Sequence, residues 1–157
     1  MRRAPARLDG ALGCAYTMRR FDRARFVAYG LLPGLNAVAL ALYTLGLATH
    51  GSGGAADAQP VLFLLIGLCL LGAAYASVLR GHDLGRPWWQ LFLAFWFALG
   101  GGPLLLALLG YLAWVRGAPD ANEYGPPPRR PGVAIWLWAA ISLVVPWLVF
   151  SLAALVA

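Results

Sequence analysis

The chain has 157 residues, of which 61% are hydrophobic and only 11% are charged. Soluble domains contain about 45–50% apolar and about 25% charged residues, so this composition excludes an ordinary soluble domain and indicates a membrane protein. The formal net charge of +6 comes from twelve arginines, with no lysine. These arginines lie at the ends of apolar runs, which suits anionic lipid headgroups and argues against a nucleic-acid partner.

A basic tail over residues 1–25 precedes a transmembrane helical domain that we predict over 26–157. The tail carries seven arginines: Arg2, Arg3, Arg7, Arg19, Arg20, Arg23 and Arg25. The apolar run that follows, 26–49, is longer than the core of about 7–15 residues found in signal peptides. We therefore expect a retained first membrane span here.

The second apolar run, 61–79, contains no charged residue and has the length of a second span of about twenty residues. Pairs of small residues four positions apart, Gly30 with Gly34 and Gly72 with Ala76, occur in the first two runs. This spacing predicts close packing between helices.

The third apolar run, 88–115, is too long for a simple span and is interrupted by glycines. As one helix of 28 residues it would extend roughly 42 Å, beyond a hydrocarbon core of roughly 30 Å. Its middle, Gly100 to Pro103, breaks helices. The run is therefore either one kinked span or a re-entrant pair of half-helices. A proline-rich loop, 116–132, and a final apolar run, 133–157, with a kink at Pro146, complete the chain.

Arginine placement predicts the orientation of these runs. Short arginine-rich loops stay in the cytoplasm, so the tail and loop 80–87 are predicted inside and the arginine-free loop 50–60 outside. A re-entrant third run would place all twelve arginines inside. Half-helices, however, leave non-helical backbone at membrane depth, and Asp120 and Glu123 weaken the rule in loop 116–132. We therefore favour an all-α bundle of about four full spans with a cytoplasmic N-terminus.

The segment 80–89 combines ionisable side chains with paired tryptophans between two apolar runs. We expect Asp83 to pair with an arginine and to fix the turn between two helices, with the tryptophans at the membrane interface. A lipid phosphate gripped by arginines and a contact with a partner protein are the alternatives. The candidate residues for these contacts are Arg80, His82, Asp83, Arg86, Trp88, Trp89, Arg20 and Arg23.

Recognised catalytic, cofactor and metal motifs do not appear in the sequence. His82 has no second histidine nearby, Cys14 and Cys69 form no framework, and no acidic residue lies in the middle of a predicted span. We expect no catalytic residue, cofactor or bound metal. Asn122, Tyr124 and Gly125 are expected to form a turn.

Three separated segments together resemble one known family. Residues 20–29, 80–89 and 117–127 read RFDRARFVAY, RGHDLGRPWW and GAPDANEYGPP. Their order and spacing are similar to those of the bacterial family catalogued as domain of unknown function 805. The resemblance implies a small multi-pass protein of the bacterial inner membrane, and it implies no activity.

For function, we expect a non-enzymatic accessory or assembly subunit of a larger membrane complex. An anionic-lipid-binding or small-solute transport protein is the alternative, followed by a membrane-embedded enzyme. The expected partners are anionic lipid headgroups and other membrane protein subunits or further copies of the chain.

Overall fold

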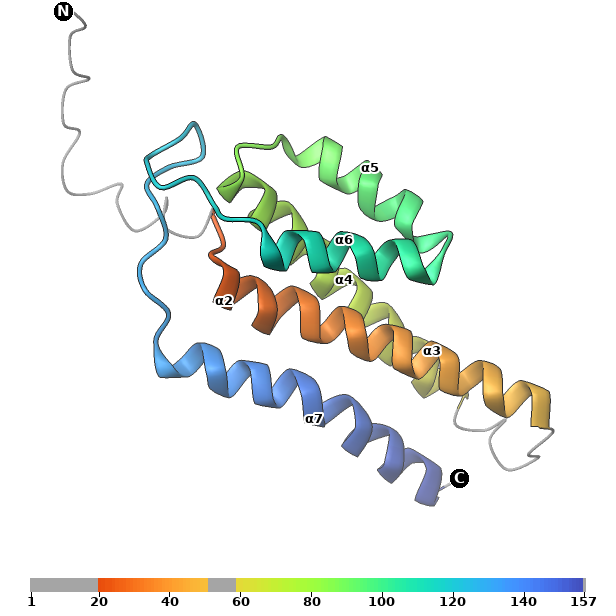
Figure 1. Ribbon diagram of the computed structural model, residues 1–157. Coiled ribbons are helices and arrows are strands. Elements are labelled where there is room, and N and C mark those ends of the chain that lie inside the picture. Colours follow the sequence, from red (N-terminus) through yellow and green to blue (C-terminus); the bar gives the residue numbers. More distant parts are fainter. Residues whose placement is uncertain (1–19, 51–58, 157) are drawn as a thin grey trace, which may run out of the picture.

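The structure is a computed structural model that describes residues 20–50 and 59–156 (Figure 1). Predictions that concern Cys14, the rest of 1–19, and residues 51–58 lie outside this range. Within it the regular structure is entirely helical, as expected from the composition. The elements are α2 (Arg23–Phe26), the π-helix η1 (Val27–Leu31), α3 (Leu32–His50), α4 (Gln59–Asp83), α5 (Trp88–Leu99), α6 (Gly102–Trp114) and α7 (Val133–Val156).

Three helices are long and apolar enough to cross a membrane. They are Arg23–Gly46, which joins α2, η1 and most of α3, then Gln59–Asp83, and Val133–Leu152. The chain is therefore a multi-pass membrane protein. Small residues allow the first two spans to approach closely. A Cβ atom on Gly30 would lie 2.7 Å from Phe26 and 2.9 Å from Ala76.

The prediction that residues 88–115 form a single kinked span is wrong. The run forms a hairpin in which α5 and α6 pack side by side and antiparallel (Figure 1). Gly100 ends α5, Gly101 is extended, and Pro103 stands in the first turn of α6. Proline suits a first helical turn because its missing N–H has no intrahelical acceptor there. The chain can thus reverse where a kinked helix would have continued.

The hairpin returns the chain to the end of the bundle at which α4 finishes. We call this the arginine end, because all eight arginines of the described residues lie there: Arg20, Arg23, Arg25, Arg80, Arg86, Arg116, Arg129 and Arg130. The main core lies between α2, α4 and the hairpin, where Phe26, Ala76, Phe95 and Leu109 are buried together.

α7 is fastened to α3 by a neutral polar group that we call the Asn36 cluster: Asn36, Ser142 and Trp147. Pro146 has no N–H to offer the carbonyl of Ser142, four residues earlier. Asn36 Nδ2 donates to that carbonyl at 2.5 Å, and Trp147 Nε1 donates to Asn36 Oδ1 at 3.0 Å. A side chain of α3 thus satisfies the backbone group that proline leaves open in α7.

The reverse contact occurs at the π-helix. In η1 the N–H of Leu32 reaches back five residues to Val27, so the carbonyl of Ala28 is the one that Pro33 would have served. The hydroxyl of Ser142 reaches this carbonyl at 3.1 Å and shares its proton with the carbonyl of Ala139 in its own helix, at 3.0 Å. Each helix therefore supplies the donor that a proline removes from the other.

Candidate functional site

The last turn of α4 places the predicted segment at the arginine end. Gly85 has a φ of +68°, the left-handed conformation that ends many helices. The N–H of Arg86 donates to Gly81 at 2.8 Å, and that of Gly85 donates to His82 at 3.2 Å. This pair of bonds stops α4 directly after Asp83 and turns the chain toward α5.

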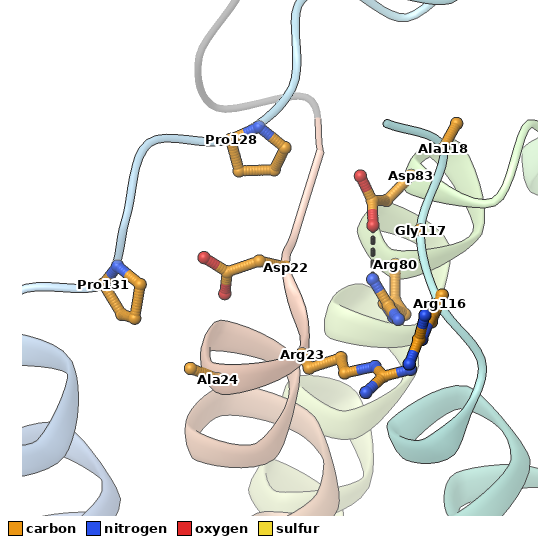
Figure 2. A pocket seen from close by; sticks show the side chains of 10 residues that line it. All are labelled: Asp22, Arg23, Ala24, Arg80, Asp83, Arg116, Gly117, Ala118, Pro128 and Pro131. Atoms are coloured by element: carbon orange, nitrogen blue, oxygen red, sulfur yellow. Dashed lines mark hydrogen bonds and ion pairs between the residues drawn. The ribbon is translucent and has the colours of Figure 1, made fainter. Parts of the chain in front are cut away.

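Asp83 is the centre of a buried ionic group that we call the Asp83 network: Arg20, Arg80 and Asp83. Arg20 donates to Oδ1 of Asp83 from Nε at 3.0 Å and from Nη2 at 2.8 Å. Arg80 donates to Oδ2 from Nη1 (Figure 2). The side chains of both arginines are only 1% exposed and that of Asp83 4%. The network thus combines two cations and one anion out of water.

The donors of Arg20 that do not bind Asp83 are taken up by backbone carbonyls. Its Nη1 donates to Asp120 at 3.0 Å and Gly125 at 2.9 Å, and its Nη2 donates to Ala118 at 2.7 Å. All three acceptors belong to the loop after α6. Arg20 therefore fastens that loop to the end of α4.

Arg80 fastens the end of α6 to α4 in the same way. Its Nε donates to the carbonyl of Leu112 at 2.9 Å and its Nη2 donates to that of Val115. The last carbonyls of a helix lack intrahelical donors, and a cation there also opposes the negative end of the helix dipole. A further bond from Nη1 to Phe21, at 3.1 Å, connects α6 with the start of α2.

The loop after α6 completes the junction by closing over the end of α4. The N–H of Ala118 donates to the carbonyl of Asp83 at 2.9 Å, and Asn122 Nδ2 donates to the carbonyl of His82 at 2.8 Å. The rings of His82 and Tyr124 stack with centroids 4.1 Å apart. Desolvation raises the pKa of the Tyr124 phenol, with Glu123 acting in the same direction, so this ring is neutral at ordinary pH.

Two details of this loop depend on residue type. Asn122 Oδ1 accepts from the N–H of Tyr124 at 2.9 Å, and Gly125 has a φ of +123°, so these three residues form the turn. A Cβ atom on Gly117 would collide with the carboxylate of Asp83. Glycine is thus needed where the loop passes over the network.

The structure brings together only some of the predicted contact residues. Arg20, Arg80 and Asp83 meet, and His82 lies beside them. Arg86, Trp88 and Trp89 are exposed at the next turn and the start of α5. Arg23 lies at the edge of the group, where its Nε donates to Val115 at 3.2 Å. Whether any of them contacts lipid or a partner stays a prediction.

Sequence reasoning missed two features. One is Arg116, whose side chain lies beside those of Arg23 and Arg80 (Figure 2). The other is the use of backbone carbonyls as the arginine acceptors. The position of Arg116 just after an apolar run was visible in the sequence, but the hairpin that carries it to this site was not favoured. Across 20–50 and 59–156, no group of three or more His, Cys, Asp and Glu side chains could hold a metal ion.

Residues 14–126 match a known family, described as protein of unknown function (DUF805). The chain belongs to the DUF805 family. The matched range includes the whole Asp83 network and the loop up to Gly125, whereas α7 lies beyond it. No curated protein and no solved structure matches the chain. Membership in DUF805 indicates no activity.

Proposed function

We propose that this DUF805 protein is a non-enzymatic subunit of a larger assembly in the bacterial inner membrane, with its arginine end in the cytoplasm. The observation that carries the proposal is the tip of the α5–α6 hairpin, Gly100 to Gly102. Non-helical backbone at this position must be shielded from lipid by protein or bordered by water. The cytoplasmic placement follows from the arginines gathered at one end.

The tip lies at a depth where lipid offers no hydrogen bonds. The arms contain 12 and 13 residues and so reach roughly 18–20 Å, short of a hydrocarbon core of roughly 30 Å. The N–H groups of Gly100 and Gly101 are bonded within the turn, to the carbonyls of Phe97 and Ala98. The N-terminus of α6 has no side-chain cap, however, and Gly100 and Gly102 are exposed. Pro103 also lacks an N–H for the carbonyl of Leu99.

Non-helical backbone inside a membrane is tolerated only where protein covers it or a water-filled cavity borders it. Large side chains beside the tip, Trp96 and Phe97, are 66% and 75% exposed and would pack against a neighbouring protein. We therefore propose that another protein surface covers the tip, either that of a second copy of this chain or that of another subunit. A water-lined tip would favour solute transport instead.

Site-specific photo-crosslinking in native membranes tests the proposal. The probe would replace Gly102, where an added Cβ meets nothing, and a control probe would replace Leu71, which is 69% exposed on α4. We expect a stoichiometric protein adduct from position 102 alone, whose mass distinguishes a second copy from a different subunit. Adducts with lipid only at both positions would contradict a protein cover.

A further inference from the structure

A cavity of about 460 Å³ opens beside the Asp83 network at the arginine end. Its walls come from the start of α2, the end of α4 and the loop between α6 and α7. Figure 2 shows the side chains of Arg23 and Arg116 pointing toward one another next to Arg80. Three guanidinium groups from three separate parts of the chain thus meet at one cavity.

The carboxylates that line this cavity are already in use. Asp83 binds Arg20 and Arg80. Asp22 binds Nη1 of Arg25 at 2.5 Å and caps α2 by accepting from the N–H of Arg25 at 2.7 Å. Arg23 and Arg116 therefore bring positive charge to the cavity without a carboxylate of their own.

Within the described residues, neither Arg23 nor Arg116 takes part in an ion pair. Arg23 donates only its Nε, to the carbonyl of Val115, which leaves its Nη groups for another acceptor. Both guanidinium groups line the same cavity, and like charges repel each other. An anion placed between the two guanidinium groups would convert this repulsion into attraction.

We propose that the cavity binds a phosphate group, held by the guanidinium groups of Arg23 and Arg116. Guanidinium offers paired N–H donors that match the spacing of phosphate oxygens. Arg80 is fixed by its own bonds to Asp83 and α6 and contributes its charge to the wall. The cavity also lies where all three spanning helices reach the same end, which is the level of lipid headgroups.

The test measures binding to the full chain in a neutral detergent. The probes are inorganic phosphate at constant ionic strength, followed by the shift of the melting temperature, and phosphatidylglycerol in phosphatidylcholine nanodiscs, followed by native mass spectrometry. Arg116→Gln removes one ligand of the proposed site. Arg130→Gln is the matched control, because this exposed arginine of the same loop does not line the cavity.

We expect Arg116→Gln to weaken binding about tenfold or more, since a bidentate charged contact is lost, and Arg130→Gln to leave it unchanged. A response to phosphatidylglycerol alone identifies the ligand as a lipid headgroup, and a response to inorganic phosphate identifies a soluble phosphate compound. If Arg116→Gln lowers the melting temperature of the unliganded protein, Arg23→Gln replaces it. Equal binding by the cavity and control variants, or no response to either probe, would overturn the site.

Discussion

The Asp83 network and the Asn36 cluster solve the same problem with different chemistry. In both, backbone carbonyls without a donor of their own, at a helix end, in a loop or opposite a proline, accept from side chains of another part of the chain. At the arginine end the donors are the guanidinium groups of Arg20 and Arg80. Between α3 and α7 the donors are a neutral amide and a hydroxyl, from Asn36 and Ser142.

Depth in the membrane explains the difference. Asn36 follows Arg23 by 13 residues, which is roughly 20 Å along the helix. A charge at that depth is costly, so neutral donors are used. Near the surface, two buried cations are tolerated because Asp83 neutralises one charge and many carbonyls accept from both. The charged junction should therefore be far more sensitive to the loss of a partner than the neutral one.

Replacing Asp83 should have the largest effect. Asp83→Asn leaves Arg20 and Arg80 buried without an anion, and breaking such a group costs about 3–5 kcal/mol of unfolding free energy. Thermal or denaturant unfolding in detergent would measure the loss. Asp120→Asn is the control, because it removes the same charge from an exposed side chain and should change little. A similar small effect of both variants would show that the network is not essential.

Filling the space above Asp83 should have the next largest effect. Gly117→Ala places a methyl group against the carboxylate, and overpacking of this kind costs about 1–3 kcal/mol. The same substitution at Gly132, where an added Cβ meets nothing, serves as a comparison. If the two alanine variants were equally stable in the same unfolding assay, the loop would not lie over the end of α4.

Breaking the neutral cluster should cost less. Asn36→Leu leaves the carbonyl of Ser142 and the indole N–H of Trp147 without partners, and hydrogen bonds between membrane helices contribute about 0.6 kcal/mol, with a maximum of about 1.7. Pro146→Ala should recover part of this loss, because alanine returns an N–H to the Ser142 carbonyl. Strictly additive effects in the double variant would argue against this pairing.

The smallest effect is expected from Ser142→Ala, which removes the donor to the carbonyl of Ala28. We expect a loss of about 0.6 kcal/mol. Ser77→Ala is the comparison. The Ser142 hydroxyl reaches Ala28 as well as Ala139 of its own helix, whereas the Ser77 hydroxyl bonds only within its own helix, to Ala73 at 2.7 Å. If the two variants had indistinguishable unfolding curves, the contact to Ala28 would contribute little to stability.

Part of this architecture could be predicted from the sequence. The helical class, the long apolar runs and the break at Gly100 to Pro103 follow from composition and from residues that interrupt helices. The pairing of Asp83 with an arginine was the expected reading, since a carboxylate beside hydrocarbon needs a partner. The sequence did not identify Arg20 as one of the two partners, because Arg20 and Asp83 are 63 positions apart.

The hairpin was not favoured because the sequence around Gly100 shows the cost of exposing backbone to lipid. The long-range bonds that stabilise the hairpin cannot be recognised from that stretch. Exposed backbone at Gly100 to Gly102 argues against half-helices in any local reading. The bonds that hold the end of α6 and the loop after it at the arginine end come from Arg80 and Arg20, which lie far away in the sequence. The same long-range contacts carry Arg116 to the cavity, so its role could not be read from neighbouring residues.

The hairpin can be tested most directly by the membrane side on which the loop after α6 lies. Single cysteines would replace Ala121, Arg86 and Pro60 in turn, in a chain carrying Cys14→Ser and Cys69→Ala, and a membrane-impermeant maleimide would be applied from either side. All three positions are exposed. We predict that Ala121→Cys is labelled from the same side as Arg86→Cys and from the side opposite to Pro60→Cys. Labelling of Ala121→Cys from the Pro60 side would mean that 88–115 crosses the membrane once, and it would contradict the hairpin and the junction built on Asp83.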